Sequence, residues 1–74
     1  MRRVTIKEGS SFETINGYIN VDLINEDGLC YCHQFIMDMD GNVAMDMFDT
    51  LTANDIAEYL KEIDGQDYEV IVER

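Results

Sequence analysis

The residues of this chain best suited to chemistry are two cysteines and a histidine in the run Cys30-Tyr31-Cys32-His33. Thiolate and imidazole groups are ligands that zinc prefers, and a cysteine beside a histidine can act as a nucleophile. In an extended strand, however, Cys30 and Cys32 point to one face and His33 to the other. A zinc site needs a fourth ligand, and no second cluster of Cys or His exists. We therefore predict small apolar fillers and a structural histidine, with no metal and no cofactor.

A second candidate site is the acidic run Asp38-Met39-Asp40-Gly41-Asn42. Its oxygen-bearing residues match the first, third and fifth positions of a calcium-binding EF-hand loop. The glycine required at the sixth position is replaced by Val43, and no flanking helices are expected. A hairpin turn accounts for the same residues, and a weak cation site at its tip is the alternative.

No motif for catalysis or phosphate binding occurs in the chain. A glycine-rich phosphate loop, the G-x-S-x-G nucleophile motif and the H-E-x-x-H zinc motif are all missing. Pairs of carboxylates are so frequent here that they carry no specific meaning for acid–base catalysis. We therefore predict a binding protein and not an enzyme.

The elements that carry these residues follow from periodicity. Alternation of apolar and polar residues, interrupted by turn residues at Asp27-Gly28 and Asp40-Gly41, predicts a meander of antiparallel strands. The strands are expected over residues 3–7, 13–24 and 29–39, from 43 onward, and over 68–73. The predicted registers place Leu23 beside Tyr31, Val21 beside His33, Ile19 beside Phe35, Phe35 beside Met47, Met37 beside Met45, and Met39 beside Val43.

One helix is expected between the fourth and the last strand. Thr52 is placed to cap its N-terminus with Asp55 in a capping box, and Leu51 and Ile56 can form a hydrophobic staple. Asp64-Gly65 ends it. The expected buried stripe is Ile56, Tyr59, Leu60 and Ile63. The prediction is one α+β domain over residues 1–74, with a helix packed on one face of a small antiparallel sheet of four or five strands, in the order β-β-β-β-α-β.

The helix can cover only one face of such a sheet. Leu29, Tyr31, Phe35, Met37 and Met39 are expected on the covered face of the third strand. The uncovered face would then carry the apolar residues Tyr18, Ile24, Cys30, Cys32, Ile36 and Phe48 and the polar residues Asn16, Asn20, Asp22, Gln34, Asp38 and Asp46. Met37, Met39, Met45 and Met47 are expected to fill the core, with an adaptable binding surface as the alternative. The uncovered face could dock a basic partner, pair with a second copy, or be covered by a terminal strand.

Charge is the strongest signal in the composition. All 16 carboxylates lie between Glu8 and Glu73, where Lys61 is the only base, and the net charge is −11. Such charge disfavours direct binding to nucleic acid or to an anionic membrane, and its self-repulsion works against the compact state. A basic protein surface, most commonly one that holds nucleic acid, is the partner it fits best, and an acidic proteome is the alternative. With 46% hydrophobic residues, no proline, no apolar run of membrane length and no signal peptide, we expect an ordered domain in the cytoplasm.

The predicted contacts with the partner are acidic side chains at turns, on strands and on the helix, together with a few apolar side chains. They are Asp22, Glu26, Asp27, Asp38, Asp40, Asp46, Asp49, Asp55, Glu58, Glu62, Tyr18, Ile36 and Phe48. In size and charge the chain resembles the small acidic inhibitors that phages direct against host defence or repair enzymes, including anti-CRISPR, anti-restriction and uracil-glycosylase inhibitors. The resemblance implies inhibition of a basic nucleic-acid-binding protein by mimicry, and it identifies no individual residues. The alternative is a module that forms a homodimer or larger oligomer through its open sheet face.

Overall fold

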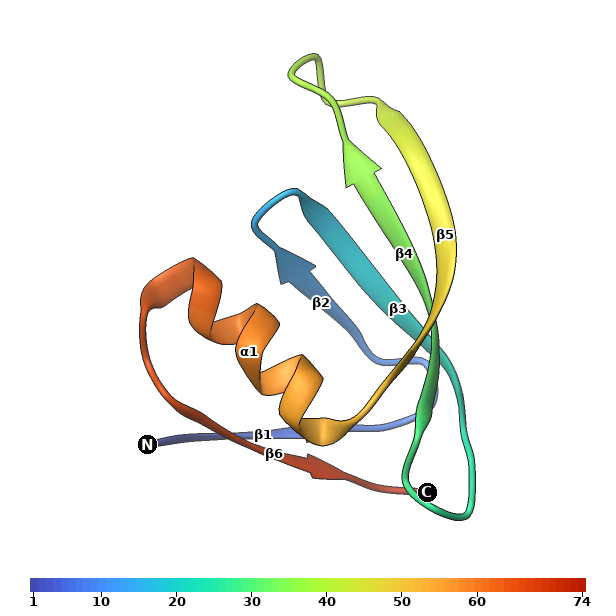
Figure 1. Cartoon of the computed structure of the whole chain (residues 1–74), viewed down its shortest axis with the longest axis vertical. Coiled ribbons are helices and arrows are strands. Elements are labelled where there is room, and N and C mark those ends of the chain that lie inside the picture. Colours follow the sequence, from blue (N-terminus) through green and yellow to red (C-terminus); the bar gives the residue numbers. More distant parts are fainter.

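The structure, a computed structural model that describes all 74 residues, contains six strands and one helix (Figure 1). They are β1 (Arg2–Ile6), β2 (Ser11–Thr14), β3 (Gly17–Ile24), β4 (Cys30–Met37), β5 (Val43–Leu51), α1 (Ala53–Asp64) and β6 (Tyr68–Val72). An antiparallel sheet has the order β2-β3-β4-β5, and β1 pairs with β6 in a separate parallel sheet. The predicted α+β class is confirmed, with five strands instead of four before the helix.

The additional strand arises from a tight turn at Ile15-Asn16, inside the segment that was expected to form one strand from Glu13 to Ile24. Thr14 pairs with Gly17 across this turn, so β2 and β3 form a two-residue hairpin. Asn16-Gly17 does not act as the usual Asn-Gly turn, because Gly17 is the first residue of β3 and neither residue has a positive φ. The period-2 alternation continues through a two-residue turn, which is why the pattern alone predicted a single strand.

The helix forms as its terminal residues predict. Thr52 Oγ1 accepts the N–H of Asp55 at 3.2 Å, and Asp55 Oδ2 accepts the N–H of Thr52 at 2.9 Å, which completes the capping box. Gly65 ends the helix with a φ of 73° in the left-handed region. Ile56 is fully buried, whereas Ile63 is 47% exposed, so the predicted stripe is wrong at its last residue.

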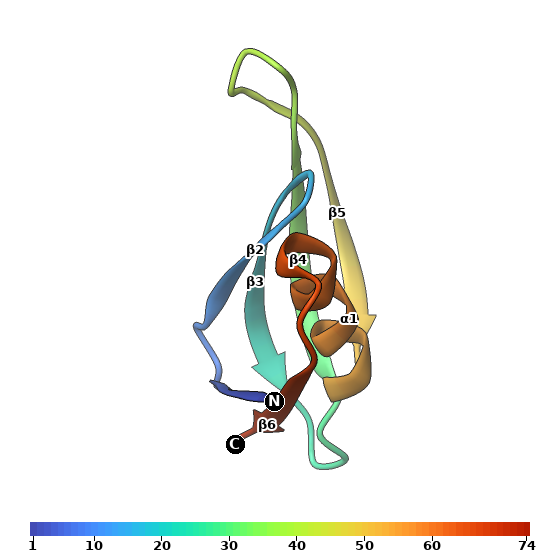
Figure 2. The same cartoon turned by 90° about the vertical axis from the view of Figure 1, so that its left-hand side faces the viewer.

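The core lies between one face of the four-stranded sheet, the helix and the β1–β6 pair (Figure 2). Its buried side chains are Ile6, Phe12, Ile19, Val21, Ile24, Cys30, Cys32, Leu51 and Ile56. Only 11 of 74 residues are buried, which fits the small core expected for this length. No helix of this fold has the length and apolar character needed to cross a membrane.

A bulge at Asp22 changes which residues of the sheet are buried. Leu23 pairs with Tyr31 as predicted, but Val21 pairs with Cys32 instead of His33. The extra residue turns Leu23 to the open face, and β4 therefore buries Cys30 and Cys32. The expected covered face of the third strand is thus wrong: Tyr31 and Phe35 lie on the open face, and Ile24, Cys30, Cys32, Gln34 and Ile36 lie on the helix side.

The same one-residue shift runs through the pairing of β3, β4 and β5. Ile19 pairs with Gln34 and not with Phe35, and Phe35 pairs with Asp46 and not with Met47. A second irregularity lies between Ile36 and Met37, and there Met37 pairs with Val43, not with Met45. The predicted registers are therefore wrong by one residue at Ile19 and Phe35 and by two residues at Met37.

The end of the β4–β5 hairpin projects beyond the rest of the sheet as an arm (Figures 1 and 2). Met39, Val43 and Met45 are exposed there and Met37 is half-buried, whereas Met47, opposite Gln34 in the body of the sheet, is 37% exposed. The helix does not reach this part of the sheet, so it does not cover the exposed side chains. The prediction that the methionines fill the core is therefore wrong, since none of them belongs to the buried cluster and Met39, Met45 and Met47 are exposed.

Candidate protein-docking surface

Four neighbouring rings, in two stacked pairs joined by one tilted contact, cross the open face of the sheet and end at its β5 edge. Tyr18 of β3 stacks on Phe35 of β4 with ring centroids 4.7 Å apart. His33 lies 4.3 Å from Phe35 and 4.6 Å from Phe48 of β5. This aromatic row is held by cross-strand pairing, since Tyr18 is opposite Phe35 and His33 is opposite Phe48. Phe48, the last ring, is 80% exposed, so the row presents an aromatic surface at the edge of the molecule.

An acidic side chain completes the row. His33 Nε2 and Asp46 Oδ2 are 3.3 Å apart, and both lie on the open face. A carboxylate beside flat aromatic faces is a suitable environment for a guanidinium or ammonium group, which can pair with the one and stack on the other. The row is therefore better suited to a basic side chain than to an anionic ligand.

A groove on the opposite side of β5 is lined by carboxylates. The acidic groove, of about 390 Å³, lies between the end of β5 and the helix, and its lining includes no basic residue. Its lining residues are Asp49, Thr50, Leu51, Asp55, Glu58, Tyr59 and Glu62. Glu58 and Glu62 are exposed and take part in no hydrogen bond or ion pair, so they are free to meet a cation. Leu51 and Tyr59 provide an apolar floor.

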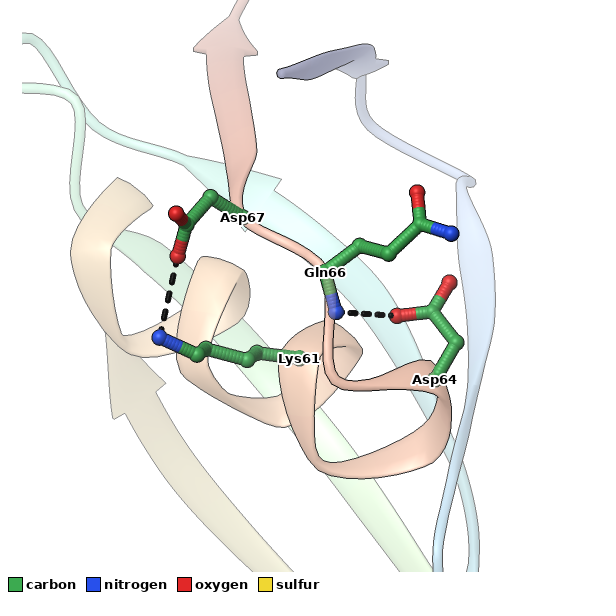
Figure 3. A network of polar contacts seen from close by, with 4 residues as sticks. All are labelled: Lys61, Asp64, Gln66 and Asp67. Atoms are coloured by element: carbon green, nitrogen blue, oxygen red, sulfur yellow. Dashed lines mark hydrogen bonds and ion pairs between the residues drawn. The ribbon is translucent and has the colours of Figure 1, made fainter.

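The helix has one lysine, and that lysine points away from the acidic groove. Lys61 Nζ donates to Asp67 Oδ1 at 2.9 Å beyond the end of the helix (Figure 3). This contact raises the pKa of Lys61 and lowers that of Asp67. Nearby, the Tyr68 hydroxyl and the Gln66 N–H both donate to Asp64 and hold its pKa below the usual range. Lys61 lies near enough to Glu58 to interact with its charge, but neither Glu58 nor Glu62 forms an ion pair with it.

A second hollow, of about 400 Å³, borders the same end of β5. It shares Asp49 and Thr50 with the acidic groove, and it adds Asp22 and the rings of Tyr31 and Phe48. The acidic groove and this second hollow thus both border the stretch from Phe48 to Leu51. This stretch brings the aromatic row and the acidic groove together at one sheet edge.

No protein-family model, curated protein or solved structure matches this chain. The surface is therefore interpreted from its own geometry and charge.

The residues with the most familiar chemistry do not form a reactive site. Burial raises the pKa of the Cys30 thiol and, with Cys30, Asp22 and Asp49 nearby, raises that of Cys32 to about 12. Both thiols are buried on the helix side of the sheet, and His33 lies on the other side, as their spacing predicted. No group of three or more His, Cys, Asp or Glu side chains is arranged to hold a metal ion.

The acidic hairpin tip has a structural role. Asp38 Oδ1 accepts the N–H groups of both Asp40 and Asn42 at 2.9 Å, which closes the turn between β4 and β5. The hairpin interpretation of this run is confirmed. The carboxylate that an EF-hand would use for calcium is occupied here by backbone donors.

The structure divides the predicted contact residues into separate groups instead of one continuous array. Asp49, Asp55, Glu58 and Glu62 line the acidic groove, and Tyr18, Asp46 and Phe48 lie on the open face. Asp22 lines the second hollow, whereas Ile36 lies on the helix side. Glu26 and Asp27 are in the β3–β4 turn and Asp38 and Asp40 in the β4–β5 turn, at opposite ends of the sheet (Figure 1).

Sequence reasoning missed part of the surface. It assigned Tyr31 and Phe35 to the core and left His33 without a role on the open face, because the bulge at Asp22 was not foreseen. A usable signal was the pair of cysteines, since Cys is among the residues most often fully buried. Placing Cys30 and Cys32 in the core would have turned the aromatic residues of the third strand outward.

Proposed function

We propose that this protein binds a basic nucleic-acid-binding protein and inhibits it by occupying the surface that holds the nucleic acid. The observation that carries the proposal is the acidic groove, with Asp49, Asp55, Glu58 and Glu62 in its lining and no base among them. None of the 16 carboxylates is buried, so their charge is directed at solvent or at a partner.

The spacing of the groove carboxylates suits a surface built for phosphates. Asp55, Glu58 and Glu62 are three and four positions apart on one helix, so neighbouring side chains are roughly 5–6 Å from each other. Each strand of a DNA duplex presents one charge per ~3.4 Å of axis, and Lys and Arg side chains are flexible enough to meet either array. Charge of this density accelerates association and makes it sensitive to salt. The aromatic row adds contact area that a purely charged surface lacks.

The biological setting we propose is that of a phage or mobile element acting in a host cytoplasm. A chain of 74 residues with a net charge of −11 has the size and charge of anti-restriction and anti-CRISPR proteins. Mimicry of nucleic acid requires no catalytic group, and the proposed mode of action is blocking by occupancy.

Affinity capture with a functional readout tests this proposal. The tagged protein is incubated with bacterial lysate at low and high salt, and captured proteins are identified and assayed for nucleic-acid binding. We expect a basic nucleic-acid-binding protein that is released by salt, is displaced by DNA or RNA, and loses its nucleic-acid binding when this chain is added. Capture of no basic protein, or capture without any loss of nucleic-acid binding, would overturn the proposal.

Self-association is the second candidate function, and the exposed apolar arm favours it. Met39, Val43 and Met45 near the hairpin tip and Phe48 on the open face of β5 are large apolar side chains exposed to solvent. Soluble monomers rarely leave contiguous apolar patches uncovered. Sedimentation of the isolated protein over a range of concentrations distinguishes the two functions, since a self-associating module forms a dimer or larger oligomer without any partner.

A further inference from the structure

The outer edge of β5 has backbone groups that no other strand pairs. β5 is the last strand of its sheet and is nine residues long. In an antiparallel ladder, the backbone groups of successive residues point alternately to the two sides of the strand. In β4, the N–H of Met37 points toward β3 and donates to Asn16 O. The other odd-numbered residues of β4 therefore also point toward β3, and the even-numbered residues, such as Gln34, point toward β5. The opposite residue, Met47, therefore points its backbone groups into the sheet.

The neighbours of Met47 in β5 must then point outward. Asp46, Phe48 and Thr50 direct their N–H and C=O groups away from β4. Consistent with this direction, the Thr50 N–H bonds to no strand and donates to the carboxylate of Asp49 at 2.9 Å. Long exposed edges are normally protected by charged side chains, proline, bulges or a covering element. Along Val43–Leu51, β5 has an irregularity near Val43 and the carboxylates of Asp46 and Asp49, but no lysine and no proline, so its protection acts against acidic strands and not against basic ones. This edge is open to an additional strand.

The two sides of this edge differ in chemistry. On the helix side, an added strand would lie beside Asp49 and the free carboxylates of Glu58 and Glu62 in the acidic groove. On the open side, it would lie beside Phe48 and the aromatic row. Side chains of a strand alternate between its faces, so an added strand would present one half of its residues to the carboxylates and the other half to the rings.

We propose that β5 accepts an extended segment of the basic partner as a fifth strand of the sheet. The segment has Lys or Arg at every second position, facing the acidic groove, and apolar residues between them, facing Phe48. This inference rests on the proposed function and specifies how the partner is held. Backbone hydrogen bonds to Asp46 and Phe48 fix the register, and the alternation of side chains gives the selectivity.

A second copy of this chain is a poor occupant of the same edge. Each copy carries a net charge of −11, and pairing two β5 strands would bring Asp46 and Asp49 of both copies together without any base in the strand. Like charges on neighbouring strands destabilise their pairing. Charge complementarity therefore favours a basic segment.

Two synthetic peptides test the mode of binding. One is a nine-residue peptide of alternating lysine and valine, equal in length to β5. The other has the same composition with its lysines in one block. We expect the alternating peptide to bind at least about tenfold more tightly, because only it can form the edge hydrogen bonds and sort its side chains between the two faces. Equal affinities of the two peptides would overturn the inference and leave the proposed function intact. Failure of both peptides to bind would also overturn the inference.

Hydrogen exchange provides a direct readout on the unmodified protein. In the free protein the amides of Asp46 and Phe48 should exchange quickly, and saturation with the alternating peptide should slow both by about tenfold or more. The amide of Met47, already bonded to β4, serves as the internal control. Binding that leaves the amides of Asp46 and Phe48 fast would show contact through side chains alone and would overturn the inference.

Matched variants separate the backbone contribution from the charge. Phe48→Pro removes the outward N–H, whereas Phe48→Ala removes the ring and keeps that N–H. The proline variant should lose at least about threefold more affinity for the alternating peptide than the alanine variant. The double variant Glu58→Gln/Glu62→Gln should also weaken binding. The control double variant Glu13→Gln/Glu73→Gln has the same net charge but lies away from β5, and it should lower the affinity for the alternating peptide by less than about twofold. Equal losses in the two double variants would overturn the assignment to the groove.

Discussion

Gly17 lies where two strands approach too closely to admit a side chain. Its φ is outside the left-handed region, so its backbone conformation is open to any residue. The requirement is steric, because a Cβ at this position would lie 2.0 Å from the carbonyl oxygen of Phe35. The close pairing of β3 with β4 at this point supports the aromatic row, in which Phe35 is the second ring.

Replacing this glycine should destabilise the fold. Gly17→Ala must push β3 and β4 apart, and we expect a loss of about 1–3 kcal/mol in the free energy of unfolding. Asn20→Ala, on the open face of the same strand, is the control and should change that free energy by less than about 0.5 kcal/mol. Urea unfolding followed by circular dichroism measures both. An unfolding midpoint for Gly17→Ala equal to that of the wild type would contradict the proposed steric requirement.

The two thiols should be inert in the native protein. With the pKa of Cys32 raised to about 12, almost none of this thiol is ionised at about pH 8, and the thiolate is the reactive form. Labelling with a thiol-specific disulfide reagent should therefore be at least about a hundredfold slower in the folded protein than in concentrated urea. Rapid labelling of both cysteines without denaturant would contradict the buried placement of Cys30 and Cys32.

At the scale of the elements, signals confined to a few adjacent residues could be read from the sequence, and signals that depend on distant residues could not. The helix follows from Thr52, Asp55 and Gly65, each of which acts within one turn of the chain. The faces of the strands depend on the single extra residue at Asp22, and no local residue preference identifies it. One such residue moves every later side chain to the other face.

The same distinction applies to the candidate site. The carboxylates of the acidic groove could be named from the sequence because acidic residues in a small soluble domain lie at its surface. The position of these carboxylates beside the edge of β5 could not be predicted, since it depends on how the helix crosses the sheet after Thr52. That Asp49 lies in the same groove as Glu58 and Glu62 is therefore known only from the structure.

The end of the helix gives a prediction for pH dependence. Hydrogen bonds from Tyr68 and Gln66 lower the pKa of Asp64 below its ordinary value of 3.8. Its contribution to stability is present above that value and is lost as the pH falls through the lowered pKa. Asp64→Asn should therefore be less stable than the wild type at about pH 7, and the difference should shrink below pH 3.8.

A charge-matched control is available on the same helix. Glu62→Gln removes one exposed carboxylate that has no hydrogen bond, so both variants relieve the same amount of net charge. Thermal unfolding of the two variants and the wild type at neutral and acidic pH makes the comparison. If Asp64→Asn and Glu62→Gln have the same stability at about pH 7, the hydrogen bonds to Asp64 make no net contribution.

At the scale of the whole molecule, charge is distributed unevenly. Arg2, Arg3, Lys7 and Arg74 lie in or beside the β1–β6 pair, where Arg3 bonds to Glu69 at 2.7 Å. The four-stranded sheet and the side of the helix that faces β5 are acidic. The molecule therefore has a less acidic end at its terminal strands and a strongly acidic side at β5, which would orient it as it approaches a basic surface.

Salt should stabilise this protein. Repulsion among carboxylates acts over distances comparable to the Debye length, which falls from ~30 Å at 0.01 M salt to ~10 Å at 0.1 M. We expect the melting temperature to rise over this range, by about 4–8 °C for each ~1 kcal/mol of repulsion removed. Calorimetry in sodium chloride and in potassium chloride tests it. A melting temperature that stays constant or falls with salt would show that the two exposed Arg and Lys ion pairs outweigh the repulsion.

The parallel pairing of β1 with β6 has a consequence for the order in which the chain can fold. The two strands join residues as far apart as Arg3 and Glu69, whereas β2 to β5 each pair with a neighbour along the sequence. Contacts between distant segments form late, because the chain loses the entropy of closing a long loop before these contacts stabilise it. During synthesis the meander can assemble as soon as β5 emerges from the ribosome. β1 must wait for β6, so Ile6 joins the core only when the last strand has been made.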